Sequence, residues 1–312
     1  MSESVIIGVD HGYAAMKTAH FSFHTGLVAH EHEPYTLNNV LEYGGKYYVV
    51  GSGRQPLQKD KTQTEDYYLL TLAAIAKELE YRNVGTVADV HLAAGLPLTS
   101  FGRDKKAFRD YLCRDGKPVS FRFEGQDYAI TISKVSLYPQ GYAAVLTQSG
   151  LLNEPSVIVA DIGGWTVDLM RLDNRIPNAA TCRSLELGMI RCVDEIGEQV
   201  RRLFGLSLTA PQIESVLRGD SASMDERVRA VIHAQADKYV RGLLSAITES
   251  GLDVRAMPTV FLGGGAALMK RHGGAVEGLF RPFILDDVCL NAKGYERLVA
   301  QMSRGERRER DG

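Results

Sequence analysis

The segments DHGYAAMK at residues 10–17 and DIGGWTVD at residues 161–168 decide the fold of this chain. Each follows a short apolar run rich in β-branched residues, at 5–9 and 157–160, and each leads into a second alternating run. The pattern predicts two β-hairpins, each with an aspartate at the mouth of a glycine-bearing turn. Glycine lets backbone N–H groups approach an anion closely, and the aspartate can hold a cation or a water beside it. The pair therefore predicts a site for a metal-bound nucleotide.

A third glycine-rich turn, at residues 263–266, follows the apolar run 258–262. One such turn is a weak signal, because acids and glycines are common in surface hairpins. Three of them, each at the carboxyl end of a predicted strand, lie where α/β sheets bind ligands. We therefore expect all three turns to serve one phosphate-bearing ligand.

The composition indicates an ordinary globular protein. A chain of 312 residues with 45% apolar content suggests about two domains, at ~150 residues each. Thirty-six basic and 38 acidic residues give a net charge of −2, too little for broad attraction to nucleic acid or anionic lipid. No leader and no apolar run near the ~20 residues of a membrane helix is present, so we expect a cytoplasmic protein. The four cysteines are widely spaced, which indicates neither a zinc site nor a disulfide framework.

The two halves of the chain repeat one order of elements. Each predicted hairpin precedes a third strand and a helix, the helix being expected at residues 67–81 in the first half and at 190–204 in the second. A further helix is expected at residues 140–148, directly after Pro139. The side chain of Asn291 is expected to cap the closing helix. Internal duplication is the simplest explanation of this order.

These features resemble the superfamily of actin, Hsp70 and sugar kinases, and within it the bacterial ParM/StbA actin-like ATPases of plasmid segregation. The resemblance covers nearly the whole chain. Beyond the phosphate turns, several stretches are similar to the Gram-positive branch of those proteins: GGKYYVVG at 44–51, DKT at 60–62, LTLAAIA at 70–76, GLPL at 95–98 and NAKGY at 291–295.

The resemblance implies an α/β protein with the actin-like ATPase fold. It implies two RNase H-like lobes, each with a small inserted subdomain, and a nucleotide in the cleft between the lobes. Residues 1–152 would form lobe I, with an insertion at about 33–66 and the closing helix 291–303 packed back on it. Residues 153–290 would form lobe II with a helical insertion at about 207–249, and 304–312 would be a flexible tail.

The resemblance also implies roles for site residues. Asp10 would hold the hydration shell of Mg²⁺, and Lys17 would reach the β- and γ-phosphates. Asp161 would position a metal-bound or attacking water, which Gln140 would orient, since glutamine is no base near neutral pH. Some relatives carry glutamate in place of Gln140. The other phosphate contacts would come from Gly12, Tyr13, Ala14, Gly163, Gly164, Trp165 and Thr166.

The nucleoside side would come from the second half. Leu268 would lie against the purine, and Glu214 would contact the ribose. The α-phosphate and purine would be lined by Gly263, Gly264, Gly265 and Ala266. Two departures from the family pattern stand out. Residues 13–15 read Tyr-Ala-Ala, which places contacts there on backbone amides, and Trp165, the only tryptophan, is bulky for a hairpin tip.

The implied activity is hydrolysis of Mg-ATP, or of GTP as the open alternative, coupled to head-to-tail filament assembly. The implied role is plasmid segregation through a small DNA-binding centromere adaptor, with no direct contact to nucleic acid or membrane. A non-polymerising nucleotide-binding protein of the same superfamily is the main alternative.

Three further classes of the superfamily each need a feature that this sequence lacks. Sugar kinases of this length commonly carry a cysteine-rich zinc motif, Hsp70 chaperones add a substrate domain, and membrane-tethered division actins end in an amphipathic helix. Residues 304–312 contain no large apolar side chain. Among single residues, Asp168 is expected to be an ordinary hydrogen-bonded hairpin residue. His24, His30 and His32 are expected to be structural or neutral rather than a metal cluster.

Overall fold

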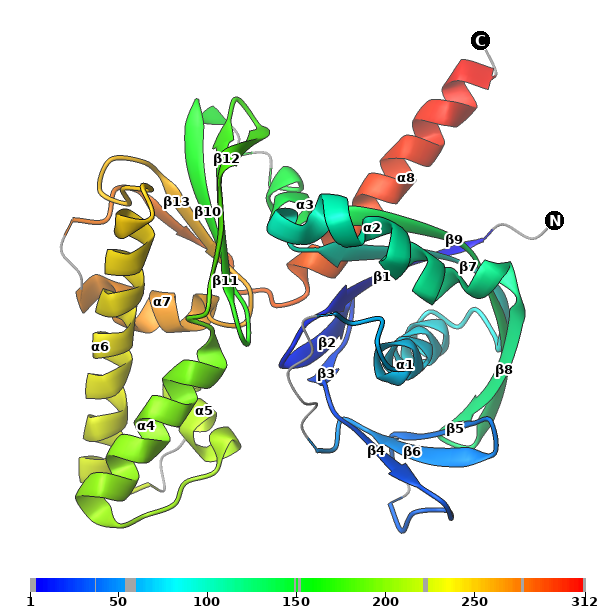
Figure 1. The fold of residues 1–312 in the computed structure, drawn as a ribbon, viewed down its shortest axis with the longest axis horizontal. Helices are drawn as coiled ribbons and strands as arrows, with labels where there is room; N and C mark the ends of the chain where they lie inside the picture. Colours follow the sequence, from blue (N-terminus) through cyan, green and yellow to red (C-terminus); the bar gives the residue numbers. More distant parts are fainter. Residues whose placement is uncertain are drawn as a thin grey trace. The chain divides into compact units, whose positions relative to one another are not determined.

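The chain forms two compact units in the computed structural model (Figure 1). Unit 1 comprises Met1–Gln148 and Cys289–Gly312, and unit 2 comprises Ser149–Val288. The boundary expected at residue 152 lies outside the described residues. The structure describes residues 4–36, 38–53, 60–148, 150, 153–220, 224–275 and 278–310, the side chains of 275 and 305–310 apart.

Unit 1 is built on a nine-stranded sheet of order β3-β2-β1-β7-β9-β8-β5-β6-β4. Strands β1, β7 and β9 are parallel, and the other neighbours are antiparallel. The strands are β1 Val5–His11, β2 Ala15–Thr18, β3 Ser22–His24, β4 Leu27–His30, β5 Val40–Tyr43, β6 Lys46–Val50, β7 Val87–Leu96, β8 Pro118–Phe123 and β9 Gln126–Pro139.

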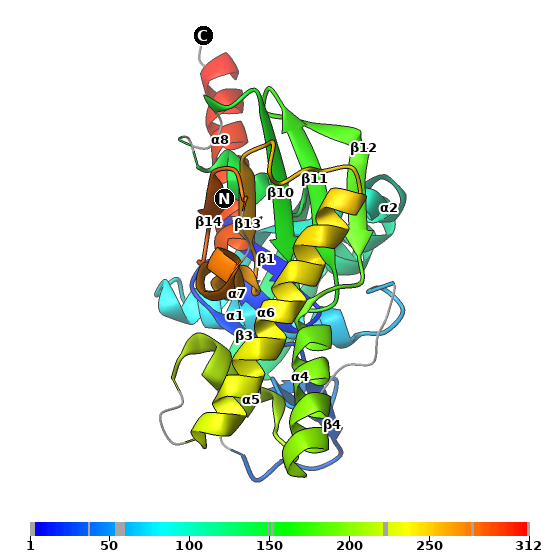
Figure 2. The same ribbon diagram turned by 90° about the vertical axis from the view of Figure 1, so that its left-hand side faces the viewer.

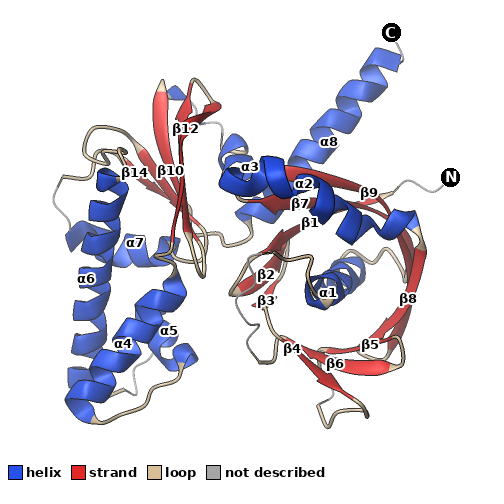
Figure 3. Cartoon of the chain, in the orientation of Figure 1, coloured by secondary structure: helices blue, strands red, loops and turns tan. Residues whose placement is uncertain are grey.

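Helix α1, Asp66–Tyr81, forms the centre of unit 1, and the strands curve around it (Figures 1 and 3). Twelve of its 16 residues are buried. A helix that is apolar on nearly all sides gains from being enclosed rather than lying on a surface. The other helices of the unit are α2 Leu98–Cys113, the 3₁₀ turn Arg114–Gly116, α3 Tyr142–Leu146 and α8 Leu290–Arg310.

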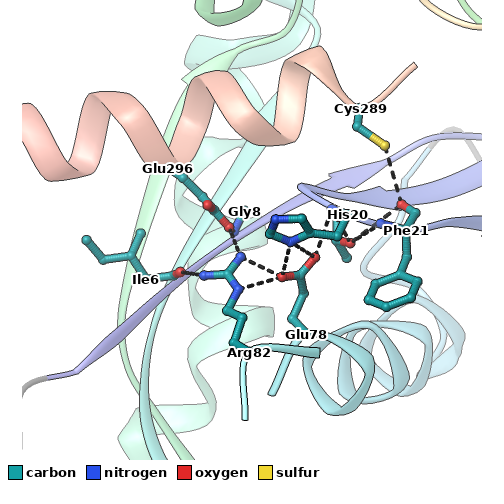
Figure 4. Close-up of polar contacts among 9 residues, drawn as sticks. Ile6, Gly8, His20, Phe21, Glu78, Arg82, Cys289 and Glu296 are labelled. Atoms are coloured by element: carbon teal, nitrogen blue, oxygen red, sulfur yellow. Dashed lines mark hydrogen bonds and ion pairs between the residues drawn. The ribbon is translucent and has the colours of Figure 1, made fainter. Parts of the chain in front are cut away.

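A buried ion-pair network joins α1 to α8 and β1 (Figure 4). The carboxylate of Glu78 is fully buried and accepts hydrogen bonds from His20 and Arg82. Arg82 also pairs with Glu296 of α8 at 2.6 Å, and Glu296 accepts a hydrogen bond from the backbone N–H of Gly8 at 2.8 Å. The network fixes the last segment of the chain to the first strand.

Unit 2 is a five-stranded sheet of order β12-β11-β10-β13-β14. Its apolar core contains residues of the sheet and of four helices. The longest of these helices, α6, crosses in front of the sheet in Figure 2. The elements are β10 Ser156–Ile162, β11 Val167–Asp173, β12 Ile176–Leu185, α4 Met189–Phe204, α5 Ala210–Arg218, α6 Glu226–Glu249, β13 Thr259–Leu262, α7 Ala266–His272, the 3₁₀ turn Gly273–Ala275 and β14 Pro282–Ile284.

The two units share one strand topology. In unit 1, β3-β2-β1-β7-β9 has two antiparallel pairs followed by two parallel pairs, and β12-β11-β10-β13-β14 in unit 2 has the same order and senses. Each β-hairpin predicted from the sequence is the equivalent first hairpin of its unit. The repeated order of elements therefore reflects a repeated fold.

Two local expectations in unit 1 were wrong, the bounds of the helix after Pro139 and the role of Asn291. Strand β9 runs through Pro139, and the helix after it is only α3, because Gly141 adopts φ +71° and turns the chain first. Asn291 lies inside α8 instead of capping it, since its Oδ1 accepts from the backbone N–H of Gly141 at 2.9 Å. Helix α8 runs to Arg310, and the flexibility expected of residues 304–312 stays a prediction. Residues 311–312 lie outside the described part.

Candidate functional site

The turn of unit 1 joins β1 to β2 at the carboxyl end of the parallel strands. Gly12 donates its N–H to the carbonyl of Asp10 at 3.0 Å, and a Cβ on Gly12 would lie 2.3 Å from the carbonyl oxygen of Ala15. The turn therefore requires glycine there. Thr25, 1% exposed, supports it from behind, donating from Oγ1 to the Gly12 carbonyl at 2.8 Å and from its N–H to the Ala14 carbonyl at 2.9 Å. No sequence pattern had indicated Thr25.

Three of the predicted polar residues meet beside this turn. The carboxylate of Asp10, 2% exposed, contacts Lys17 Nζ at 3.3 Å and accepts a hydrogen bond from Gln140 Nε2 at 2.8 Å. Burial alone would raise the pKa of Asp10, but the charges of Lys17 and Lys61 and the Gln140 amide outweigh it and hold the pKa below its ordinary value. The buried carboxylate is therefore ionised at neutral pH.

A second lysine reaches this group from a distant segment. Lys61 donates from Nζ to the backbone carbonyl of His11, and its charge also acts on Asp10. The His11 ring contacts Thr71 Oγ1 at 2.8 Å, and burial lowers the pKa of His11 to about 3, with Lys61 contributing. His11 is thus neutral. Residues 60–62 stood out in the sequence only as a family-like stretch, so the signal for Lys61 was weak.

The turn of unit 2 is fixed by the start of α4. Gly163 donates to the carbonyl of Thr166 at 2.9 Å, which closes the hairpin. Behind the tip, the carbonyls of residues 163, 164 and 165 accept hydrogen bonds from the N–H groups of residues 189, 190 and 188, at 3.0, 2.9 and 2.8 Å. A Cβ on Gly188 would lie 2.4 Å from the carbonyl oxygen of Gly164, so this contact requires glycine. Gly188 is a supporting residue that no sequence motif had marked.

The two turns differ in charge. In unit 1, Asp10 is directly opposite Lys17 across the hairpin, whereas in unit 2 Asp161 is opposite Asp168. Asp161 is 8% exposed. Asp168 accepts hydrogen bonds from Thr166 Oγ1 and Ser184 Oγ, as expected for a bonded hairpin residue. The first turn is suited to anions, and the second brings two carboxylates to one face of a hairpin.

The third turn packs directly behind Asp161. Gly263 has φ +84°, and a Cβ on it would lie 2.3 Å from Asp161 Oδ1. A Cβ on Gly265 would lie 2.2 Å from the side chain of Ile162, while one on Gly264 would meet no atom within 4 Å. Ala266 then begins α7. Gly263 and Gly265 are thus required by packing, and the space beside Gly264 can admit a ligand.

Two residues outside this turn, Leu268 and Glu214, were also expected to contact the nucleoside. Leu268 is 4% exposed and packs in the core of unit 2, so its side chain offers little surface to a base. Glu214 is exposed on α5 and lies 3.6 Å from Arg218. The backbone N–H of Leu268 donates to the carbonyl of Gly265 at 3.1 Å, which ties Leu268 to the third turn through the main chain. Both assignments stay predictions.

The described residues contain neither a direct metal cluster nor a membrane helix. Within them, no group of three or more histidine, cysteine or acidic side chains is arranged to hold a metal ion directly. His24, His30 and His32 therefore do not form such a group in the described structure. None of the helices in the described part of the chain is both long and apolar enough to span a membrane.

Proteins of known family and structure share this architecture. Residues 8–142 match the model of the N-terminal domain of actin-like proteins. No curated protein sequence matches the chain significantly. Among solved structures, the archaeal actin homologue Ta0583 has a TM-score of 0.77 at 19% identity, covering 96% of this chain and 99% of the homologue. A ParM from a 15-stranded Clostridium botulinum filament has 0.72 at 18% identity, with 96% and 99% covered.

Apo psk41 ParM is also similar, with a TM-score of 0.70 at 17% identity, covering 97% of this chain and 99% of that one. These findings define the class: the chain has the fold of actin homologues, with two lobes of shared topology. More particularly, residues 8–142 match the model of the N-terminal domain of actin-like proteins, and ParM proteins are among the solved structures that the chain resembles in fold. A structure of Ta0583 is a complex with ADP.

Proposed function

We propose that this protein is a cytoplasmic, Mg²⁺-dependent ATPase that assembles into head-to-tail filaments. The observation that carries the proposal is the pair of equivalent hairpins, with a lysine beside the first aspartate and a second carboxylate beside the other. Phosphate groups need cations and backbone N–H donors, whereas a hydrated metal ion and an attacking water need carboxylates. The ADP complex of Ta0583, which has the same fold, supports a nucleotide as the ligand.

The side chains present fit a nucleotide with its metal ion. Asp10 is held ionised, as a partner of hydrated Mg²⁺ must be, and Lys17 lies 3.3 Å from it. Beside Gly264 the chain provides open space where a Cβ would meet no neighbour. When bound, Mg²⁺ would neutralise charge on the phosphates and lower the pKa of coordinated water, with Asp10 and Asp161 holding it through water.

The residues of the chain then have distinct tasks. Backbone N–H groups of residues 13, 14 and 164–166 bind phosphate oxygens, because those of Gly12 and Gly163 donate within their own turns. Lys17 neutralises charge that develops as the terminal phosphate leaves. The amide of Gln140 donates from Nε2 to Asp10, so Oε1 is the atom that can accept a hydrogen bond from water. Gln140 and Asp161 would orient that water for in-line attack.

The ATPase assignment is tested by Asp161→Asn. The substitution keeps the shape of the side chain and removes its charge, so we expect phosphate release to fall by about 10²–10⁴-fold, as for loss of a positioned catalytic group. Binding of Mg-ADP, measured by calorimetry, should change little. Asp110→Asn, the same change at an exposed position on α2, is the matched control. Phosphate release by Asp161→Asn at the wild-type rate would contradict the assignment.

We also propose that the filaments separate plasmid DNA through a small DNA-binding adaptor at a centromere. ParM proteins with this fold form filaments, one of them 15-stranded. The net charge of −2 gives the chain no general affinity for DNA, which favours an adaptor. Head-to-tail growth needs an open, heterologous interface, in which one surface of the subunit binds a different surface of the next.

A further inference from the structure

A second ammonium group lies beside the turn of unit 1. Lys61 is 50 residues from His11 in sequence, yet its Nζ donates to the His11 carbonyl, directly before the glycine of the turn. The same Nζ lies 5.5 Å from the centre of the Tyr67 ring, a cation–π contact with the start of α1. Two lysines from different elements therefore act on the one carboxylate of Asp10.

Two contacts shape the segment that carries Lys61, a turn within it and a hydrogen bond to α2. Asp60 Oδ1 accepts from the N–H of Thr62 at 2.9 Å and from its Oγ1 at 2.7 Å, which forms a tight turn around Lys61. A little further on, the carbonyl of Thr64 accepts a hydrogen bond from the hydroxyl of Tyr111 at 2.8 Å. Lys61 is therefore directed to the phosphate turn by local structure and not only by its attraction to Asp10.

The two ammonium groups at this turn have different partners. Lys17 lies 3.3 Å from the Asp10 carboxylate, whereas Lys61 donates to the backbone carbonyl of His11. A neutral backbone carbonyl is a weaker partner for an ammonium group than a phosphate oxygen, because hydrogen bonds between ionised groups are roughly twice as strong.

We propose that Lys61 binds the terminal phosphate of the nucleotide and makes the site prefer a nucleoside triphosphate over a diphosphate. The inference rests on the proposed ATP site and adds a specificity-determining residue to it. Lys17 bonds directly to the Asp10 carboxylate, whereas Lys61 reaches the turn through a backbone carbonyl that a phosphate can replace. Exchange of that partner would place the ammonium group on the phosphate with its segment still anchored.

The test compares two dissociation constants in each variant. Calorimetry measures the binding of Mg-ADP and of a non-hydrolysable Mg-ATP analogue to wild type, Lys61→Met and Lys61→Arg. We expect Lys61→Met to bind the ATP analogue at least about tenfold more weakly, the loss typical of a hydrogen bond to a charged group, and ADP within about threefold. Lys61→Arg should keep most of the preference. Lys105→Met, on the exposed side of α2, should leave both constants unchanged.

The outcomes separate this inference from the proposed function. If wild type binds neither nucleotide, the proposed site fails and the inference fails with it. If wild type binds both nucleotides, and Lys61→Met weakens the binding of both equally or of neither, only the role of Lys61 is overturned. The melting temperature without nucleotide reports on folding. If Lys61→Met is unstable, Lys61→Gln takes its place, because it keeps a donor for the His11 carbonyl but carries no charge. It must then show the same change in the ratio of the two dissociation constants.

Discussion

At the scale of single residues, neighbouring glycines have unlike reasons to be glycine. Gly263 has a positive φ, and its missing Cβ is what lets Asp161 approach. Gly264, next to it, has open space where a Cβ would lie. Packing within the chain explains the first, and a bound ligand is the reason that we propose for the second.

Alanine at each of these positions should therefore have a different effect. Gly263→Ala should lower the free energy of unfolding by about 1–3 kcal/mol, because it combines a strained φ with a steric clash. Gly264→Ala should change it by less than about 1 kcal/mol and weaken Mg-ATP binding. Urea unfolding and calorimetry measure the two quantities. Equal stability losses in both variants would show that Gly264 is also a packing residue.

At the scale of elements, α8 is held on unit 1 by close backbone approach and by buried charge. A Cβ on Gly8 would lie 2.2 Å from the carbonyl oxygen of Ala292, and one on Gly294 would lie 2.5 Å from that of Ala143. The network of Glu78, Arg82 and Glu296 crosses the same contact (Figure 4). The last helix is thereby part of the fold of the first half.

Removal of the buried charge should loosen this contact. Glu78→Gln should lower the free energy of unfolding by about 3 kcal/mol, because it breaks a buried ion pair while leaving Arg82 in place. Glu80→Gln, at an exposed position on the same helix, is the control and should change it by less than about 0.5 kcal/mol. Urea unfolding followed by circular dichroism measures both. A Glu78→Gln protein as stable as the control would show that the network contributes no net stability.

The same carboxylate should make stability depend on pH. Burial would raise the pKa of Glu78, but hydrogen bonds from Thr18 and His20 and the charge of Arg82 lower it below the ordinary 4.5. The folded state thus holds the proton less tightly than the unfolded state. The stabilisation is present above pH 4.5 and is lost as the pH falls through the folded pKa, by at most about 1.4 kcal/mol per pH unit. Below pH 4.5, wild type should lose stability more steeply than Glu78→Gln; parallel curves would contradict the assignment.

At the scale of the whole molecule, the two units share one topology and each contributes one hairpin. Asp10 is opposite Lys17 in unit 1, and Asp161 is opposite Asp168 in unit 2. If both hairpins serve one nucleotide, assembly should depend on that nucleotide. We expect purified protein to pellet with Mg-ATP and to pellet less with Mg-ADP or without nucleotide, with light scattering giving the time course. A protein that hydrolyses ATP without assembling over a wide concentration range would favour the non-polymerising alternative.

Much of the site could be predicted because its residues are close in sequence. Asp10, Gly12 and Lys17 lie on one hairpin, as do Asp161 and Thr166, so spacing alone brings each set together. Thr25, Lys61 and Gly188 were missed because they reach the turns through tertiary contacts. Asn291 was misplaced for the same reason, since its amide oxygen accepts from the N–H of Gly141, 150 residues away.

The sequence by itself determined the two hairpins, their aspartates and the repeated order of elements, because alternating apolar runs and glycine turns are local signals. Only the tertiary structure decided that Gln140 joins Lys17 at Asp10, that Lys61 reaches the same turn, and that Glu296 of α8 bonds to Gly8. These features depend on pairing between segments 50 to almost 300 residues apart, such as Lys61 with His11 and Glu296 with Gly8. No local pattern encodes such pairing, because it depends on which distant segments the folded chain brings together.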